Sequence, residues 1–293
     1  MHARAPLRIG LGGGGTDLFP FRRTFGGCTL SVTVRKYATA TLGGKNNISP
    51  LVSAIKDKFD FKENIEISVE APPYSGLGAS AAIAVATIGL IAKGRLPRES
   101  IADLAFKIER EELKISGGAQ DQYASSIGGF NYYEYNTDSV IVLPMIRSSF
   151  LDELERRLVL VFVKKREMSG SGGAIQEDIS RRDNDVNLCS IKETCNEMRH
   201  AIRQEDMKLF GELLDFSWQE KKKLSPFIAD DFILNVEYEV KKAGALGFKL
   251  SGAGGGGYAL ILCEDLNSVR EKIVELGLLP EKVEFDWDGL VVA

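Results

Sequence analysis

The chain has 293 residues, of which 44% are hydrophobic and 27% are charged, and its formal net charge is −4. This length predicts two domains or one large domain with a sizeable core. The mild acidity argues against nucleic acids and anionic membranes as partners, because both call for a basic face. The four cysteines show no CxxC pair and no metal-ligand spacing, so we expect reduced thiols in a cytoplasmic protein.

Nothing in the sequence predicts a membrane segment. The amino terminus lacks the apolar region of a signal peptide. The longest apolar run, residues 79–92, is shorter than the roughly 20 residues that span a bilayer. It is more typical of a buried core helix.

The first half of the chain is predicted to hold strands, a helix and a hairpin. β-Branched residues and partial alternation predict strands at 7–11, 29–42 and 65–71. Apolar residues at helical spacing, from Ile101 to Ile108, predict a helix over 99–115. A hairpin is expected at 131–145.

The second half begins with a predicted strand at 156–165, and helices are expected over 174–243. The remaining predicted elements are strands at 248–251, 258–263 and 282–287 and a helix at 266–277. This order favours an α+β fold with mixed or antiparallel sheets. We place the predicted domains at residues 1–155 and 156–293.

Three glycine-rich loops stand out, at residues 10–18, 72–80 and 251–257. The first and third fit GxGxxG, but a dinucleotide fold needs a helix directly after the motif and an acid about 20 residues later. Pro20 interrupts the first case, and residues 31–42 offer no acid. No Walker GxxxxGK[ST] motif is present in the sequence.

The second loop, "PPYSGLGAS", stands directly before the apolar run. Its glycines allow a close approach of the backbone to a ligand, and the helix that follows offers unpaired amides and a positive dipole end to an anion. The loop therefore suits a phosphate held by a buried helix. A tight turn before a core helix is the alternative, and the loop by itself does not decide between them.

The order of the loops along the chain is more informative than any single loop. "RAPLRIGLGGGGTD" (4–17), the second loop, "GGAQDQYASSIGG" (117–129) and "SGAGGGG" (251–257) together resemble the GHMP kinases over nearly the whole chain. Within that family the segments look most like D-glycero-D-manno-heptose 7-phosphate 1-kinases. The resemblance implies a two-domain fold with a ferredoxin-like C-terminal domain, and a cytoplasmic enzyme that uses ATP and Mg²⁺.

The resemblance also implies roles for individual residues. Asp121 matches the catalytic aspartate, and Arg8 matches an arginine that pairs with it. Ser80 and Glu109 match the magnesium-binding pair. The residues that would hold ATP are Pro73, Ser75, Gly76, Leu77, Gly78, Ala79, Ser80, Gly252, Ala253 and Gly254. The residues that would bind the sugar phosphate are Gly14, Thr16, Asp17, Gly118, Arg22 and Arg166.

Each role has a structural alternative. Asp121 could cap a helix, Glu109 could sit on a wet helix face, and Asp17 could cap a turn. Other candidates for a distal phosphate are Arg23, Lys164 and Lys165. We expect "WQEKKKL" (218–224) to be a solvated helix face.

The function expected from the resemblance is transfer of the ATP γ-phosphoryl group to the anomeric hydroxyl of D-glycero-D-manno-heptose 7-phosphate. Another sugar-1-kinase, of the fucose or galactose type, is an open alternative. So is a catalytically idle sensor of sugar or nucleotide. The partners are then small molecules, with a homodimer as a possible assembly.

Overall fold

Two antiparallel sheets form the framework of the protein. The computed structural model describes residues 1–45, 47–166 and 172–293. The first sheet has the order β10-β1-β2-β4-β5, with β3 beside β2. Its strands are β1 (His2–Gly12), β2 (Gly27–Leu42), β3 (Ile65–Val69), β4 (Phe130–Tyr135), β5 (Val140–Pro144) and β10 (Val291–Val292).

The second sheet has the order β7-β8-β6-β9. Its strands are β6 (Leu158–Lys164), β7 (Ala245–Leu250), β8 (Gly257–Cys263) and β9 (Pro280–Lys282). The first and third strands of this half, β6 and β8, lie adjacent in the middle, as in a ferredoxin-like sheet. The predicted α+β class with a ferredoxin-like second half is confirmed.

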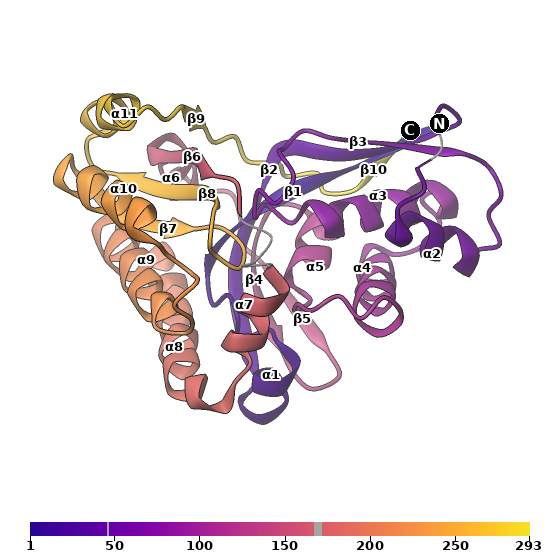
Figure 1. The fold of residues 1–293 in the computed structure, drawn as a ribbon, viewed down its shortest axis with the longest axis horizontal. Helices are drawn as coiled ribbons and strands as arrows, with labels where there is room; N and C mark the ends of the chain where they lie inside the picture. The colour runs from indigo at the N-terminus through magenta and orange to yellow at the C-terminus, as the bar shows by residue number, and fades with distance from the viewer. Residues whose placement is uncertain (46, 167–171) are drawn as a thin grey trace.

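Helices cover both sheets (Figure 1). Those of the first half are α1 (Phe19–Phe25), α2 (Pro50–Lys58), α3 (Ala79–Ala92), α4 (Arg98–Lys107), the π-helical turn η1 (Ile108–Glu112), α5 (Gln120–Ile127) and α6 (Ser149–Arg157). Those of the second half are α7 (Gly172–Ile179), the 3₁₀ turn η3 (Arg182–Asn184), α8 (Asp185–Arg203), α9 (Met207–Lys222), α10 (Asp231–Lys242) and α11 (Leu266–Glu275). The helices α3, α4 and α5 pack beside the first sheet, and α9 and α10 pack on β7.

The helix α3 is buried along most of its length, which explains why it is apolar on every side. It packs against β1 and β2 and against α4 and α5. Its small residues permit close contacts, and a Cβ at Gly89 would lie 2.8 Å from a methyl group of Leu290. The prediction of a core helix after the second loop is confirmed.

Two predicted elements differ in the structure. The helix expected over 99–115 is α4 followed by the wider turn η1, which re-aims the side chains after Lys107. The strand predicted at 282–287 is wrong. That stretch leaves β9 and makes a single bridge from Phe285 to Val34, so its buried apolar residues carry the chain from the second sheet to the first.

The end of the chain returns to its start. Ala293 and His2 exchange backbone hydrogen bonds of 2.8 and 2.9 Å, and β10 pairs with β1. The last residues therefore complete the first sheet, while the division at residue 156 stays a prediction. All four cysteines are free. Among the helices of the described ranges, none has the length and apolar character to cross a membrane.

Candidate active site

The three glycine-rich loops meet between the two sheets. The Arg8 amide donates to the Leu77 carbonyl at 2.9 Å, which joins β1 to the second loop. The Tyr258 amide donates to the Ser75 carbonyl at 2.9 Å, which joins the third loop to the second. Gly76 has a φ of +78°, and a Cβ there would lie 2.5 Å from the Ser251 carbonyl oxygen. Glycine at this position lets the two loops touch.

The second loop ends at the tip of α3. Gly78 is the N-cap, with a φ of 76° and a ψ of 26°, and no side chain caps this helix in the described structure. The first-turn amides of α3 and the positive end of its dipole are thus available to an anion. The tip therefore has the unpaired amides of the anion site that the sequence predicts, and phosphate binding there stays a prediction.

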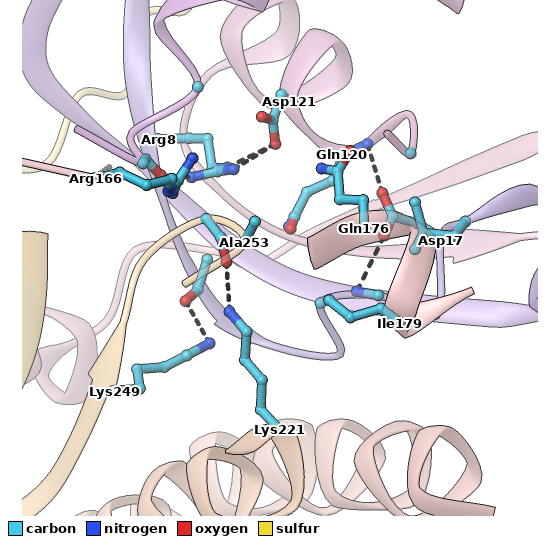
Figure 2. Close-up of a pocket in the computed structure, with 18 of the residues that line it drawn as sticks. Arg8, Asp17, Gln120, Asp121, Arg166, Gln176, Ile179, Lys221, Lys249 and Ala253 are labelled. Carbon is cyan, nitrogen blue, oxygen red and sulfur yellow. Dashed lines mark hydrogen bonds and ion pairs between the residues drawn. The ribbon is translucent and has the colours of Figure 1, made fainter. Parts of the chain in front are cut away.

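Arg8 and Asp121 form an ion pair beside this tip, in which the Arg8 side chain is buried and the Asp121 side chain is 28% exposed. Two nitrogens of the Arg8 guanidinium lie 2.8 and 2.6 Å from Asp121 Oδ1. The third nitrogen, Nη1, donates to the Gly76 carbonyl at 2.6 Å and to Ser251 Oγ at 3.4 Å. Arg8 therefore fixes the carboxylate of Asp121 against both loops, as Figure 2 shows for the pair itself.

Asp17 is a buried carboxylate held by backbone amides. It accepts hydrogen bonds from the amides of Gln120 at 3.2 Å and Gly15 at 3.3 Å. Burial raises the pKa of Asp17, and the nearby charge of Asp121 raises it further, while the amide donors oppose both effects. Gly118 passes so close that a Cβ there would lie 1.8 Å from Asp17 Oδ2.

Ser80 and Glu109 meet below the tip of α3. The Ser80 hydroxyl donates to Glu109 Oε1 at 2.7 Å, and the Gln122 side-chain amide donates to Oε2 at 2.5 Å. Glu109 lies in the turn η1 and is only 1% exposed, so the alternative of a wet helix face is wrong. A π-type turn inside a helix is frequent at functional sites.

Two cavities flank the second loop and share Gly76 and Gly78. The first, which we call the apolar cavity, has a volume of about 660 Å³. Its wall is formed mainly by Pro50, Leu51, Tyr74, Ile83, Leu113 and Ile115. The predicted ATP residues that also line it are Ser75, Gly76, Gly78, Ala79 and Ser80.

The second, the polar cavity, has a volume of about 180 Å³ (Figure 2). The predicted site residues that line it are Arg8, Gly14, Asp17, Gly76, Gly78, Gly118, Asp121, Arg166, Gly252 and Ala253. Residues far apart in the sequence thus meet at one site. The helix tip separates an apolar space, suited to a planar base, from a space with two carboxylates.

The comparisons with known proteins agree with this geometry. Residues 46–129 match the GHMP kinases N terminal domain, and residues 198–277 match the GHMP kinases C terminal domain. A D-glycero-alpha-D-manno-heptose 7-phosphate kinase of Campylobacter jejuni is 31% identical, over 88% of this chain and 88% of that protein. This chain belongs to the GHMP kinase family. The expectation of an ATP-dependent small-molecule kinase is confirmed.

Other members of the family resemble the chain as well. A crystal structure of a D-glycero-D-manno-heptose 1-phosphate kinase from Bacteroides thetaiotaomicron has a TM-score of 0.78 at 28% identity, covering 99% of this chain and 97% of that one. A bifunctional fucokinase/GDP-fucose pyrophosphorylase of Arabidopsis thaliana is 30% identical over 76% of this chain and 22% of that longer protein.

Several predicted site residues of the kinase lie outside the two cavities. Leu77 is fully buried, and Thr16 anchors the first loop through the carbonyls of Gly13 and Cys28. Pro73 lies beside Tyr74, which lines the apolar cavity. Gly254 accepts a hydrogen bond from Arg166 Nε at 2.7 Å.

The basic residues predicted to bind a distal phosphate lie in different surroundings in the kinase structure. Arg166 lines the polar cavity, whereas Arg22 packs over the rings of Phe19 and Phe106 and donates to the Thr137 carbonyl. Lys164 is ion-paired with Asp230. Arg23 and Lys165 are exposed.

Three cations of the polar cavity were missed by sequence reasoning: Arg110, Lys221 and Lys249. Lys221 and Lys249 line the polar cavity and are 6% and 5% exposed. The prediction of a solvated face at 218–224 is therefore wrong for Lys221 and for the buried Trp218. The sequence offered one weak signal, since Lys249 stands two residues before the third loop in an apolar strand.

Proposed function

We propose that this kinase transfers the γ-phosphoryl group of ATP to the anomeric hydroxyl of D-glycero-D-manno-heptose 7-phosphate. The Arg8–Asp121 pair carries the proposal, because it lies beside the helix tip and inside a cavity that also holds Asp17. The Campylobacter and Bacteroides relatives, which are named for heptose phosphates, support this acceptor. The product is the 1,7-bisphosphate, a precursor for nucleotide-activated heptose.

The proposed reaction follows from the positions of the two carboxylates. The adenosine occupies the apolar cavity, and the phosphates lie at the α3 tip. The anomeric oxygen bonds to the γ-phosphorus while the bond from phosphorus to the β,γ-bridging oxygen breaks and ADP leaves. Asp121 orients the hydroxyl and takes its proton as the new bond forms, and Arg8 faces the negative charge of the transferring group.

Asp17 is proposed to hold the sugar itself. Its carboxylate is fixed by the Gln120 and Gly15 amides and faces the polar cavity. A rigid acceptor group can position sugar hydroxyls without entering the transfer step. Fixing the acceptor against the γ-phosphorus contributes to rate because phosphoryl transfer depends mainly on positioning and charge neutralisation.

Ser80 and Glu109 are proposed to hold Mg²⁺. Glu109 is a buried carboxylate that accepts hydrogen bonds from the Ser80 hydroxyl and the Gln122 side-chain amide. Hard oxygen ligands suit this ion, which keeps waters and takes phosphate oxygens as its other ligands. Within the described ranges no group of three or more His, Cys, Asp or Glu side chains could hold a metal. The ion supplies charge neutralisation at the phosphates.

The division into domains 1–155 and 156–293, and a cytoplasmic location, are part of the same proposal. In this arrangement the first domain supplies the helix tip, Arg8 and Asp121. The second supplies the third loop, which packs on the first domain at Gly76. The site therefore needs both domains.

ADP release across a panel of acceptors tests the function. The panel contains heptose 7-phosphate, the same heptose without its phosphate, fucose, galactose and mevalonate, each with and without Mg²⁺. We expect Mg²⁺-dependent ADP release that is fastest with heptose 7-phosphate. Faster release with fucose or galactose would favour the other sugar-1-kinases, and release that no acceptor stimulates would favour a sensor.

A further inference from the structure

The polar cavity carries more positive than negative charge. Five of its described lining residues are Arg or Lys, and two are Asp. Arg8 is paired with Asp121. The guanidinium of Arg110 is held by the carbonyls of Ile115 at 3.0 Å and Gly118 at 3.2 Å. Three cations remain, which we call the cation cluster: Arg166, Lys221 and Lys249.

Each member of the cation cluster donates to a backbone carbonyl instead of a carboxylate. Lys249 Nζ donates to Gly10 at 2.8 Å and to Leu11 at 3.1 Å. Lys221 donates to Gly252, and Arg166 Nε donates to Gly254. These bonds leave charge and donors unused, because an ammonium has three N–H groups.

The unused donors are an unusual feature of a buried site. Lys249 keeps one N–H and Lys221 keeps two, while Arg166 Nη2 is buried without a partner among the described residues. Burial lowers the pKa of Lys221 well below its usual range, and the charges of Lys249, Arg166 and Arg8 lower it further. Burial, followed by the charge of Arg8, lowers the pKa of Lys249 to about 8. Packing alone would be served better by apolar side chains.

A bound phosphate would accept hydrogen bonds from these unused donors. The position of the cation cluster indicates whether that phosphate belongs to ATP or to the acceptor. The helix tip, where the γ-phosphoryl group belongs, is served by Arg8 and Asp121. Lys249 instead holds the carbonyls of the first loop between Arg8 and Asp17, on the acceptor's side. Figure 2 shows Arg166, Lys221 and Lys249 at one side of the cavity and Asp17 and Gln120 at the other.

We propose that Lys221, Lys249 and Arg166 bind the phosphate that the acceptor already carries, and so make the kinase select phosphorylated over unphosphorylated sugars. This inference rests on the proposed function and adds the residues that determine its specificity. The sugar ring then lies between the cation cluster and Asp17, with its anomeric hydroxyl at Asp121. Charged donors suit a dianionic phosphate, for which they form short, strong hydrogen bonds.

The test compares the wild type and two variants with two acceptors. The wild type, Lys221→Met and Lys249→Met are assayed with heptose 7-phosphate and with the heptose that lacks the phosphate. Methionine keeps most of the length of the lysine stem and removes the charge. We expect kcat/KM for heptose 7-phosphate to fall about 100-fold or more in each variant, while kcat/KM for the unphosphorylated heptose changes less than about threefold.

Two further variants accompany this comparison, one as a control and one as a substitute for an unstable variant. Lys223→Met is the matched control, because Lys223 lies two residues from Lys221, is 58% exposed and pairs with Glu220; we expect it to behave as the wild type. Arg166→Gln removes a half-buried member of the cluster, and it is used if a lysine variant unfolds at a lower temperature. It should lose selectivity in the same direction.

The outcomes separate the inference from the proposed function. Equal losses with both acceptors would overturn the inference, since the cations would then serve ATP or the fold. A wild type that prefers unphosphorylated sugars would overturn it too. If the wild type uses another sugar phosphate instead of heptose 7-phosphate, the proposed acceptor is wrong. The same comparison with that sugar phosphate and its unphosphorylated form then decides the inference.

Discussion

At the scale of single residues, the two carboxylates of the polar cavity should differ in what they do. Asp121 is paired with Arg8 beside the helix tip, whereas Asp17 is held by backbone amides. Asp121→Asn preserves an oxygen for Arg8 but removes the proton acceptor. We expect kcat to fall by about 10²–10⁴-fold, while the Kd for ATP changes less than about twofold.

Asp17→Asn is the comparison for Asp121→Asn. Because Asp17 is proposed to position the acceptor, its variant should raise the KM for the sugar phosphate more than it lowers kcat. Steady-state kinetics and nucleotide titration give these numbers, and thermal unfolding shows whether each variant folds. Normal turnover in Asp121→Asn would remove this residue from the mechanism.

The pKa of Lys249 gives a pH prediction. It is lowered to about 8 by burial first and by Arg8 second, with a small opposing effect from Cys195. Lys221 and Arg166 face the same cavity. The free enzyme therefore loses the Lys249 charge as pH rises through 8, while the second pKa of a phosphate group, near 6, keeps the acceptor dianionic.

We expect kcat/KM for heptose 7-phosphate to fall above about pH 8, by up to tenfold per pH unit. The unphosphorylated heptose should lack this decrease, and so should Lys249→Met with either acceptor. The measurement is a pair of pH–rate profiles in buffers of constant ionic strength. Parallel profiles for the two acceptors would contradict a role of Lys249 in binding the phosphate.

At the scale of elements, the contact between the second and third loops should set both stability and nucleotide binding. Gly76→Ala places a Cβ 2.5 Å from the Ser251 carbonyl oxygen at a φ of +78°. The backbone must shift, so we expect the free energy of unfolding to fall by about 1–3 kcal/mol and the KM for ATP to rise.

Gly14→Ala is a matched control for Gly76→Ala. Gly14 also lines the polar cavity, but a Cβ there meets nothing within 4 Å. Its free energy of unfolding should stay within about 0.5 kcal/mol of the wild type. Urea titrations measure both values. Equal stability of the two variants would show that the loops separate without cost.

The elements also explain what the sequence could predict. Glycine-rich loops and a uniformly apolar helix are local patterns, so the helix tip could be expected from the sequence. The meeting of Arg8 with Asp121 was implied only by the resemblance to the GHMP kinases. Lys221 and Lys249 depend on how α9 packs against β7, a contact that no local pattern encodes. Every residue of β7 after Gly247 is buried. An alternation of apolar and polar residues could therefore not indicate which way Lys249 points. The prediction that Arg22 binds the distal phosphate was made without knowledge of its packing. In the structure the rings of Phe19 and Phe106 hold its guanidinium.

At the scale of the whole molecule, the end of the chain joins the two sheets. After β9 the chain crosses to the first sheet, bridges Val34 at Phe285 and ends as β10 beside β1. Leu290 is 6% exposed on this path, with its methyl groups against Gly89 of α3. The helix that carries the phosphate-binding tip is therefore packed against the last residues of the protein.

This connection predicts that Leu290 contributes to stability from far outside the site. Leu290→Ala should lower the free energy of unfolding by about 2–5 kcal/mol, because it leaves a cavity against α3. Leu279→Ala removes the same atoms from a side chain that is 79% exposed, and it should change stability by less than about 0.5 kcal/mol. Chemical denaturation of both variants, with and without ATP, makes the measurement. If the two variants unfold alike, the chain end is a tail that lies on the surface, and α3 keeps its place without it.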